Sequence, residues 1–316
     1  MTPVSCKCKR PFIKGDLPFG CGQCLPCRIR RRRRWVHRLS LENRLHGDSA
    51  FITLTYDPKK ETFPKGGSLV PKDLTDWLKR LRRNFTTNPI RYFAVGEYGE
   101  VSQHPHFHAI LFGFPTCTGA RCQDKNPRYA CQACQIIRST WDRGHIYNGD
   151  VTKDSLSYVA GYVTKGLTQS NDYTEKILQG RAPEFSRMSL RPGIGAGAAV
   201  KIAESLSSVS TFSEAFFGAT SDVPSILLTD QKLQPVDRYL KAVMRKTLGW
   251  AEPQKSPTGA LDGFKKEMSE LFQEHFKDAP FAPDRFQKKM LLTELSRDAI
   301  INIEAKFKKY NLRGAL

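Results

Sequence analysis

The sequence predicts an α+β fold in which antiparallel strands form a sheet that helices flank. Residues 51–58 alternate apolar side chains with threonines, as a half-buried strand does. Residues 91–100 and 103–114 are two further predicted strands, and the short turn between them predicts an antiparallel hairpin. Segments 73–85 and 154–167 instead repeat their apolar residues at the spacing of a helix.

Composition and charge indicate a folded protein with a polyanionic partner. The chain has 316 residues, of which 40% are hydrophobic, and this suffices for a substantial core. Fifty Lys and Arg against 31 Asp and Glu give a formal charge of +19, which favours nucleic acid or a membrane surface as partner. No apolar run approaches the roughly 20 residues of a membrane span, and the N-terminal MTPVSCKCKRPF lacks the apolar core of a signal peptide. We therefore expect a cytosolic protein that binds nucleic acid and no membrane.

The chain should divide into three regions. Residues 1–48 form a Cys-rich segment that leads into an Arg-rich helix, and residues 49–200 form the core, with a Cys-rich insertion at 115–135. Residues 201–316 should be mainly helical, with an amphipathic helix at 262–278 and one long helix at 284–311. We expect these C-terminal helices to pack on the core or to mediate self-association, and we interpret His275 as an ordinary helix residue.

The stretch QHPHFHAILFGF places histidines at every second position of a predicted strand. Successive side chains of a strand point to opposite faces, so His106 and His108 share one face. In the predicted hairpin, Glu97 lies across from them and points to the same side. Two imidazoles and a carboxylate form a mixed site that could hold Mg²⁺, Mn²⁺ or Zn²⁺. His104 has the same parity, and we leave it as a candidate outer group of the site.

The helix predicted at 154–167 carries two phenols and an amine along one edge. Tyr158, Tyr162 and Lys165 follow one another at i, i+4 and i+7, opposite the apolar edge of the helix. Surface tyrosines beside a lysine are the ordinary interpretation of such a pattern. With a metal nearby, however, a phenol whose pKa is ordinarily near 10 can attack a phosphate, because the metal and the lysine favour the phenolate. We expect the product to be a 5′-phosphotyrosine, whose retained ester can later be used for rejoining.

Two sets of cysteines have the spacing of metal ligands. One has four thiols within a short loop and suits a tetrahedral structural zinc site: Cys117, Cys122, Cys131 and Cys134. The other, Cys21, Cys24 and Cys27, needs a fourth ligand, for which Cys6 and Cys8 are the candidates. Reduced surface cysteines or a disulfide are the alternatives for the first set, and the total of nine leaves at least one thiol over in any pairing.

Five consecutive arginines lie in the predicted helix that follows the N-terminal cysteines: Arg30, Arg31, Arg32, Arg33 and Arg34. They cover every face of its first turns. A solvated charge run is the usual explanation, but a run unbalanced by acids repels itself unless phosphates lie nearby. We expect these side chains to contact the DNA backbone.

Several of these motifs together resemble a known family. HPHFH, the upstream FITLTY and YVAGYVTK are similar to the three motifs of the HUH endonucleases that initiate rolling-circle replication. CGQCLPCR, GEYGE and MSLRPGIG resemble in particular the replication initiation proteins of the Microviridae, in the gokushovirus branch of single-stranded DNA phages. The resemblance covers about residues 20 to 200.

The resemblance implies a fold, a reaction and partners. It implies a ferredoxin- or RRM-like antiparallel sheet with the metal, Mg²⁺ or Mn²⁺, on its face and the tyrosine helix alongside. The histidine pair matches His106 and His108, the tyrosine pair matches Tyr158 and Tyr162, and Lys165 matches the lysine that follows. We expect the chain to nick one strand of single-stranded DNA at the phage origin, in the cytoplasm of the bacterial host. A host polymerase and helicase would then extend and unwind, and a second tyrosine would close the displaced circle.

Two other functions remain open at this point. One is a related HUH protein that acts as a relaxase or a single-strand transposase, against which the paired tyrosines count. The other is a zinc-stabilised DNA-binding protein without catalysis, for which the cysteines and arginines suffice but which leaves the histidine strand unexplained. The sequence does not indicate the oligomeric state or the origin sequence.

Overall fold

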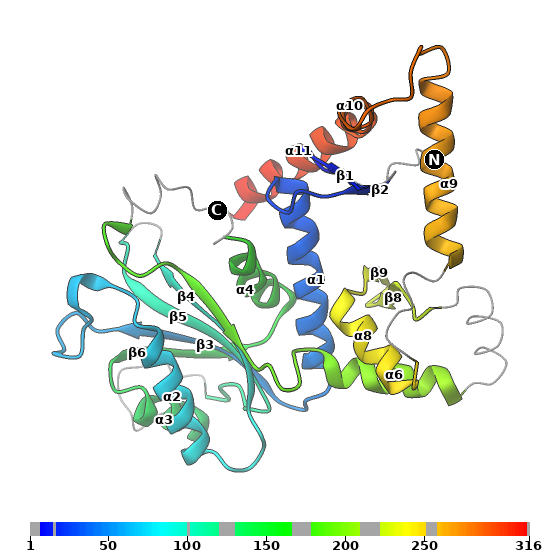
Figure 1. Ribbon diagram of the computed structural model, residues 1–316. Helices are drawn as coiled ribbons and strands as arrows, with labels where there is room; N and C mark the ends of the chain where they lie inside the picture. Colours follow the sequence, from blue (N-terminus) through cyan, green and yellow to red (C-terminus); the bar gives the residue numbers. More distant parts are fainter. Residues whose placement is uncertain are drawn as a thin grey trace. The chain divides into compact units, whose positions relative to one another are not determined.

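The computed structural model describes residues 7–14, 17–99, 102–119, 130–165, 178–208, 222–250 and 258–314 (Figure 1). The chain forms two compact units. One comprises Arg32–Lys201, and the other combines Met1–Arg31 with Ile202–Leu316.

The first unit is built on a five-stranded antiparallel sheet. In the order β6 (Gly144–Asp150), β3 (Ser49–Tyr56), β5 (Pro105–Phe112), β4 (Arg91–Tyr98) and β7 (Phe185–Met188), each strand pairs antiparallel with its neighbours. The predicted α+β class, with an antiparallel sheet and flanking helices, is confirmed.

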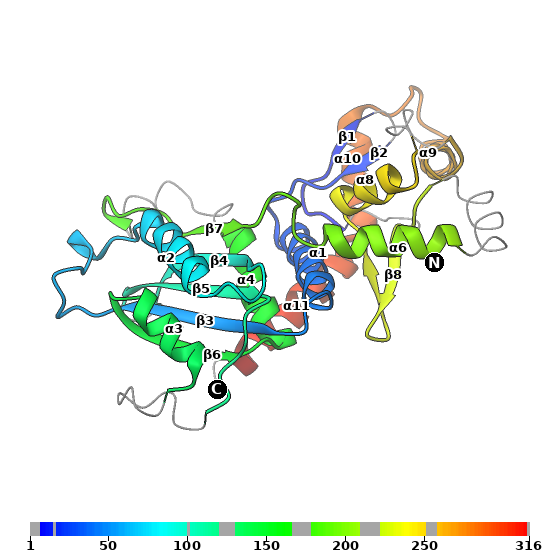
Figure 2. The same cartoon turned by 90° about the horizontal axis from the view of Figure 1, so that it is seen from below.

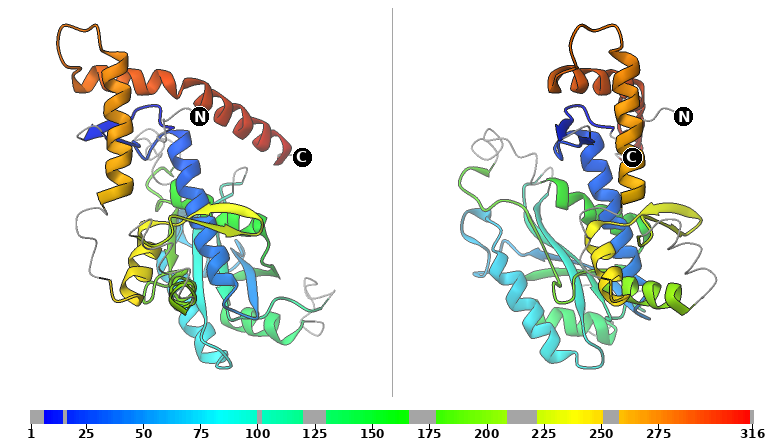
Figure 3. Two further views of the ribbon diagram at one scale, coloured as in Figure 1. Left: turned by 90° about the vertical axis from the view of Figure 1, so that its right-hand side faces the viewer. Right: turned by 45° about the vertical axis from the view of Figure 1, so that its right-hand side comes forward.

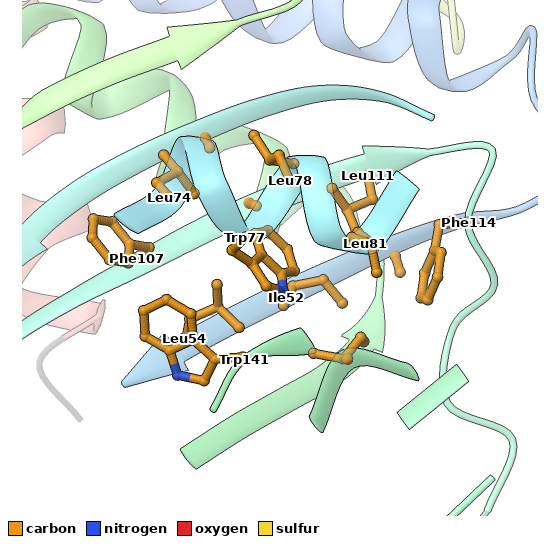
Figure 4. Packing of buried hydrophobic residues seen from close by; sticks show 14 of the residues in the cluster. Ile52, Leu54, Leu74, Trp77, Leu78, Leu81, Phe107, Leu111, Phe114 and Trp141 are labelled. Atoms are coloured by element: carbon orange, nitrogen blue, oxygen red, sulfur yellow. The ribbon is translucent and has the colours of Figure 1, made fainter. Parts of the chain in front are cut away.

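One face of the sheet carries the larger core. Helices α2 (Pro71–Asn84) and α3 (Gln132–Thr140) cover this face (Figure 2). Ile52 and Leu54 of β3 point into it and meet Trp77 of α2 and Trp141 beyond α3, all fully or almost fully buried (Figure 4). A short 3₁₀ helix, η1 (Lys65–Gly67), precedes α2.

The opposite face is covered by α4 (Lys153–Lys165) and by the part of α1 (Leu25–Asn43) that belongs to this unit. Leu39 of α1 and Val159 of α4 pack on Phe93 and Ile110 of the sheet. Toward the end of α1, Glu42 is 1% exposed and is hydrogen-bonded to Arg91 and to the backbone N–H of Gly195. This face therefore has its apolar packing at one end, which leaves its other end for polar groups. Helix α6 (Ala196–Ser208) follows this contact.

The second unit holds two small hairpins and four helices among its described residues. The elements are β1 (Phe12–Lys14), β2 (Leu17–Phe19), β8 (Ile226–Thr229), β9 (Lys232–Pro235), α8 (Arg238–Thr247), α9 (Thr258–His275), α10 (Arg285–Leu295) and α11 (Arg297–Gly314). The β1–β2 hairpin lies beside α10 (Figure 3), where Ile13 joins a cluster with Met268, Phe272, Leu291 and Leu292.

The long helix predicted at 284–311 is wrong in one respect, because it is broken into α10 and α11. Ser296, 2% exposed, separates the two, and its hydroxyl donates to the carbonyl oxygen of Leu292 at 2.7 Å. A serine that bonds back to the preceding turn competes with the helix ladder and bends it. No described helix combines the length and the apolar character that a membrane crossing requires.

Candidate active site

The β4–β5 pairing brings the predicted site residues together. Glu97 and His106 are direct cross-strand partners, and His108 pairs with Val95, two positions along. The predicted hairpin register is thereby confirmed, although residues 100 and 101 of its turn lie outside the described part of the chain. Ile110 and Phe112, at the same parity, enter the core with α1 and α4. The histidines therefore lie on the face of the sheet that α4 covers.

Glu97 is the centre of the cluster. Its Oε1 lies 2.7 Å from Nε2 of His106 and 2.8 Å from Nε2 of His108. The residue is only 2% exposed, and its other oxygen, Oε2, is buried without a hydrogen-bond partner among the described residues. One ligand atom from each of the three residues lies within 4.8 Å of the others.

The hydrogen bonds of His106 place a lone pair opposite this carboxylate. Its Nδ1 lies 2.9 Å from the backbone carbonyl oxygen of His104, which can only accept, so Nδ1 carries a hydrogen. In the neutral ring Nε2 is then an acceptor that faces another acceptor, Oε1 of Glu97. Such a pair needs a shared cation, either a proton or a metal ion.

The pKa values agree with a shared cation at this point. Burial alone would raise the pKa of the Glu97 carboxyl, but hydrogen bonds from His106, His108 and Tyr158 lower it to about 2. Burial would lower the pKa of His106, but the hydrogen bond to Glu97 and the His104 carbonyl raise it. Glu184, 8% exposed, adds a second negative charge that raises it further.

These donors fit a divalent ion. Ligand atoms about 2.1 Å from one ion lie about 3.0 Å apart at a right angle. The separations of 2.7 and 2.8 Å around Glu97 therefore need only a small expansion to admit one. Oε2 of Glu97, buried and without a partner among the described residues, offers a further oxygen.

Helix α4 brings both predicted tyrosines to this cluster. The hydroxyl of Tyr158 donates to Oε1 of Glu97 at 2.5 Å, and the hydroxyl of Tyr162 donates to that of Tyr158 at 3.2 Å. The Tyr158 ring lies edge-on to His108, with 5.1 Å between centroids, and Tyr158 is 41% exposed. The attacking groups expected from the sequence are thus close to the metal ligands and open to solvent. Lys165 ends α4, and its side chain lies outside the described part.

One of the five arginines holds the tyrosine helix. Arg32 donates from Nε to the carbonyl oxygen of Ser157 at 2.9 Å, and from Nη2 to its hydroxyl at 2.8 Å. Ser157 precedes Tyr158 on α4. Arg32 therefore positions this helix, whereas Arg31, Arg33 and Arg34 are exposed.

Two residues of the site were missed by sequence reasoning. Oγ1 of Thr53 lies 2.9 Å from Nδ1 of His108 and orients that ring, as the His104 carbonyl orients His106. The signal was available, because Thr53 has the parity of the polar face of its strand. Glu184 had no recognisable pattern around it. The imidazole of His104 bonds instead to the carbonyl oxygen of Tyr56 at 2.8 Å.

The cysteine sets also cluster. Cys8, Cys21, Cys24 and Cys27 form one group of candidate ligands, in which Cys8 supplies the fourth thiol, while Cys6 lies outside the described residues. Cys117, Cys131 and Cys134 form the other group, and their predicted partner Cys122 also lies outside the described residues.

Comparison with known proteins places this site within a matched segment. Residues 49–167 match the model of a family of replication-associated proteins described by its member ORF2. The chain is 33% identical over 167 residues to replication-associated protein VP4 of Bdellovibrio phage phiMH2K, covering 49% of this chain and 50% of that protein. It is 34% identical over 195 residues to replication-associated protein ORF2 of Spiroplasma virus 4, covering 59% and 58%. With replication-associated protein ORF4 of Chlamydia phage 1 it shares 26% identity over 161 residues, covering 48% and 39%.

The chain thus spans about half the length of the curated relatives it matches. These matches confirm the resemblance to phage replication proteins of the Microviridae that the motifs indicated. No solved structure matches the chain significantly.

Proposed function

Because the segment that carries the site, residues 49–167, matches the ORF2 family of replication-associated proteins, we propose that this chain initiates phage rolling-circle replication. It nicks single-stranded DNA at the origin through a covalent 5′-phosphotyrosine and later rejoins the strand. The observation that carries the proposal is the contact of Tyr158 with Glu97, the carboxylate that both histidines also contact.

Glu97, His106 and His108 would hold the divalent ion, Mg²⁺ or Mn²⁺. When bound, it would stabilise the negative charge that develops on the non-bridging oxygens of the scissile phosphate. The protein supplies the orientation of the ligands: the His104 carbonyl fixes His106, and Thr53 fixes His108.

Tyr158 is placed for the first transfer. Its oxygen attacks the phosphorus, the bond from phosphorus to the 3′ oxygen breaks, and the 3′ oxygen takes up a proton and leaves as a free hydroxyl. The 5′ phosphate stays as an ester on Tyr158. Glu97 Oε1 fixes the direction of the phenol by accepting its hydrogen, and the charge of Lys165 favours the phenolate.

Tyr162 gives the site its second nucleophile. Its hydroxyl lies 3.2 Å from that of Tyr158, so both phenols reach the same linkage region. A second transfer to Tyr162 can then occur before the first ester is resolved, which allows the displaced circle to close while a host polymerase and helicase continue.

Charge supports the DNA partner. The formal charge of +19 attracts a polyanion, and the exposed Arg31, Arg33 and Arg34, with Arg30, would contact phosphates. Cys117, Cys131 and Cys134, together with Cys122, would bind a structural Zn²⁺ that closes the insertion.

A denaturation-resistant adduct tests the function. The protein is incubated with labelled single-stranded origin DNA and Mn²⁺, and the products are separated on a denaturing gel. Wild type should form a covalent adduct that EDTA abolishes. Tyr158→Phe and Tyr162→Phe should each keep some cutting or joining, and the double variant should form none, whereas Tyr239→Phe in α8 serves as an unaffected control. An adduct from the double variant would refute the assignment.

The same assay separates the alternatives. A non-catalytic zinc-stabilised DNA-binding protein would bind the DNA and form no adduct. A relaxase or single-strand transposase would form the adduct but on other DNA sites. The matches to phage replication-associated proteins favour the initiator over both.

A further inference from the structure

The cysteine cluster at the N-terminus has the dimensions of a tetrahedral metal site. Zinc binds thiolate sulfur at about 2.3 Å, so two sulfurs at neighbouring corners of a tetrahedron lie about 3.8 Å apart. Sγ of Cys24 lies 3.7 Å from Sγ of Cys8. The sulfurs of Cys8, Cys21, Cys24 and Cys27 all lie within 4.8 Å of one another. A disulfide requires about 2.05 Å, and all four cysteines are free.

Backbone amides point at these sulfurs. The N–H groups of Arg10 and Cys21 donate to Sγ of Cys8 at 3.4 and 3.2 Å, and that of Cys24 donates to Sγ of Cys21 at 3.3 Å. Hydrogen bonds to sulfur favour the charged thiolate and are the outer contacts that orient metal ligands. Cys8, Cys24 and Cys27 are buried, at 0, 8 and 7% exposure.

We propose that Cys8, Cys21, Cys24 and Cys27 bind one Zn²⁺, with Cys8 as the fourth ligand, and that this ion fastens the β1–β2 hairpin to the start of α1. Cys8 precedes the hairpin and Cys21 follows it, while Cys24 and Cys27 lie at the first turn of α1. A hairpin of three-residue strands is marginal by itself. The ion holds both of its ends.

The fastened hairpin also contacts the C-terminal helices. Ile13 of β1, 3% exposed, packs on Leu291 and Leu292 of α10 and on Phe272 of α9. Lys9, next to Cys8, pairs with Glu304 of α11 at 2.6 Å. The zinc therefore stabilises the packing of α9 to α11 on the hairpin, and it does so whether or not the chain is a nuclease.

Metal content of matched variants tests the site. The full-length protein is purified under reducing conditions, and its zinc is counted by mass spectrometry. Cys8→Ser should hold one zinc per chain less than wild type, whereas Cys6→Ser, the other candidate from the sequence, should hold as much as wild type. Full zinc content in Cys8→Ser, or an equal loss in Cys6→Ser, would overturn the proposal.

Measurements on the wild type guard against a variant that merely fails to fold. N-ethylmaleimide should spare the four cysteines while zinc is bound and modify all four after chelation. Amide exchange should then rise in β1 and α10 but not at Leu54 in the central strand β3. Alkylation of Cys8 at one rate with and without zinc, or a disulfide at Cys8, would contradict the proposal.

A second, independent observation concerns the face of the sheet that carries the histidines. In the strand register, Thr53 of β3 pairs with His108 on one side and with Tyr147 of β6 on the other. Paired residues point to the same face, so Tyr147 lies on the site face, two strand spacings or about 10 Å from His108 along the sheet. Tyr147 is 42% exposed.

The backbone makes room for this ring. A Cβ at Gly149 would lie 2.5 Å from Oη and 2.7 Å from Cε1 of Tyr147, so the ring lies over the glycine, close to the sheet. Resting on the proposed nuclease function, we infer that Tyr147 is a stacking platform for a base of the single strand beside the scissile linkage. Aromatic rings bind bases of any sequence in this way.

Binding without cleavage tests the platform. The affinity for a fluorescein-labelled oligothymidylate is measured by anisotropy in EDTA. Tyr147→Ala should raise the Kd about five-fold or more, whereas Tyr147→Phe, which keeps the ring, and Tyr239→Ala, which removes an exposed ring elsewhere, should not. Wild-type affinity in Tyr147→Ala refutes the platform alone, because failure of the nuclease function shows instead as a missing adduct with wild type.

Discussion

The orientation of His108 by Thr53 gives a prediction that separates the metal site from a plain histidine pair. Thr53→Val keeps the shape and the β-branch of the side chain and removes only the hydroxyl that lies 2.9 Å from Nδ1 of His108. Loss of an outer partner of a metal-bound imidazole ordinarily costs about 10- to 100-fold in metal affinity, which corresponds to about 1.4 to 2.7 kcal/mol.

The same strand provides a matched control. Thr55 lies two residues along on the same face and pairs with His106, but His106 is oriented by the His104 carbonyl instead. Thr55→Val should therefore bind Mn²⁺ as wild type does in isothermal titration, while Thr53→Val should bind about 10-fold more weakly or worse. Equal affinity of both variants would refute the reasoning.

Three further predictions concern the supports of the site. Glu42→Gln should destabilise the protein by about 3 kcal/mol at neutral pH, since it leaves the largely buried Arg91 without its charged partner. Although burial opposes it, bonds from His46, Gly195 and Arg91 lower the pKa of Glu42. Its stabilisation is therefore complete above the ordinary carboxyl pKa and lost as pH falls through the lower folded value, so in urea titrations the gap between variant and wild type should narrow in acid. Arg32→Ala should destabilise by about 1.5 kcal/mol through its lost hydrogen bonds to α4 and slow adduct formation. Arg31→Ala should instead leave the melting temperature unchanged and reduce the salt dependence of single-strand binding by a slope of about 0.7.

The hairpin and its site could be predicted because period-two parity is a strict rule. Glu97, His106 and His108 needed only the alternation of side chains and a short turn to be placed together. Tyr158 and Tyr162 needed only the helical period for their common edge. That this edge faces the histidines rather than solvent was a prediction from chemistry, because no local pattern fixes how a helix packs on a sheet.

The remaining strands were not recognised, for physical reasons. β6 is an edge strand with the exposed His145 and Tyr147 on one side, so it lacks the apolar alternation of a half-buried strand. β7 has four residues, too few for any period to show. The break at Ser296 likewise depends on one buried hydroxyl rather than on a proline or glycine.

Outer contacts were the least accessible to sequence reasoning. The carbonyl of His104 orients His106, and a carbonyl has no sequence signature. Arg32 differs from its neighbours in the arginine run only through its contact with Ser157, which lies 125 positions further along the chain. Such pairings follow from the fold and cannot precede it.

The central claim is that a phenol of α4 becomes covalently attached to DNA beside the Glu97, His106 and His108 cluster. Trypsin should release residues 154–165 as one peptide carrying both tyrosines. After reaction with single-stranded origin DNA and nuclease digestion, mass spectrometry should find a nucleotide on Tyr158 or Tyr162 in this peptide, and Glu97→Ala should lack it. A nucleotide on any other residue, or an unchanged yield in Glu97→Ala, would contradict the claim.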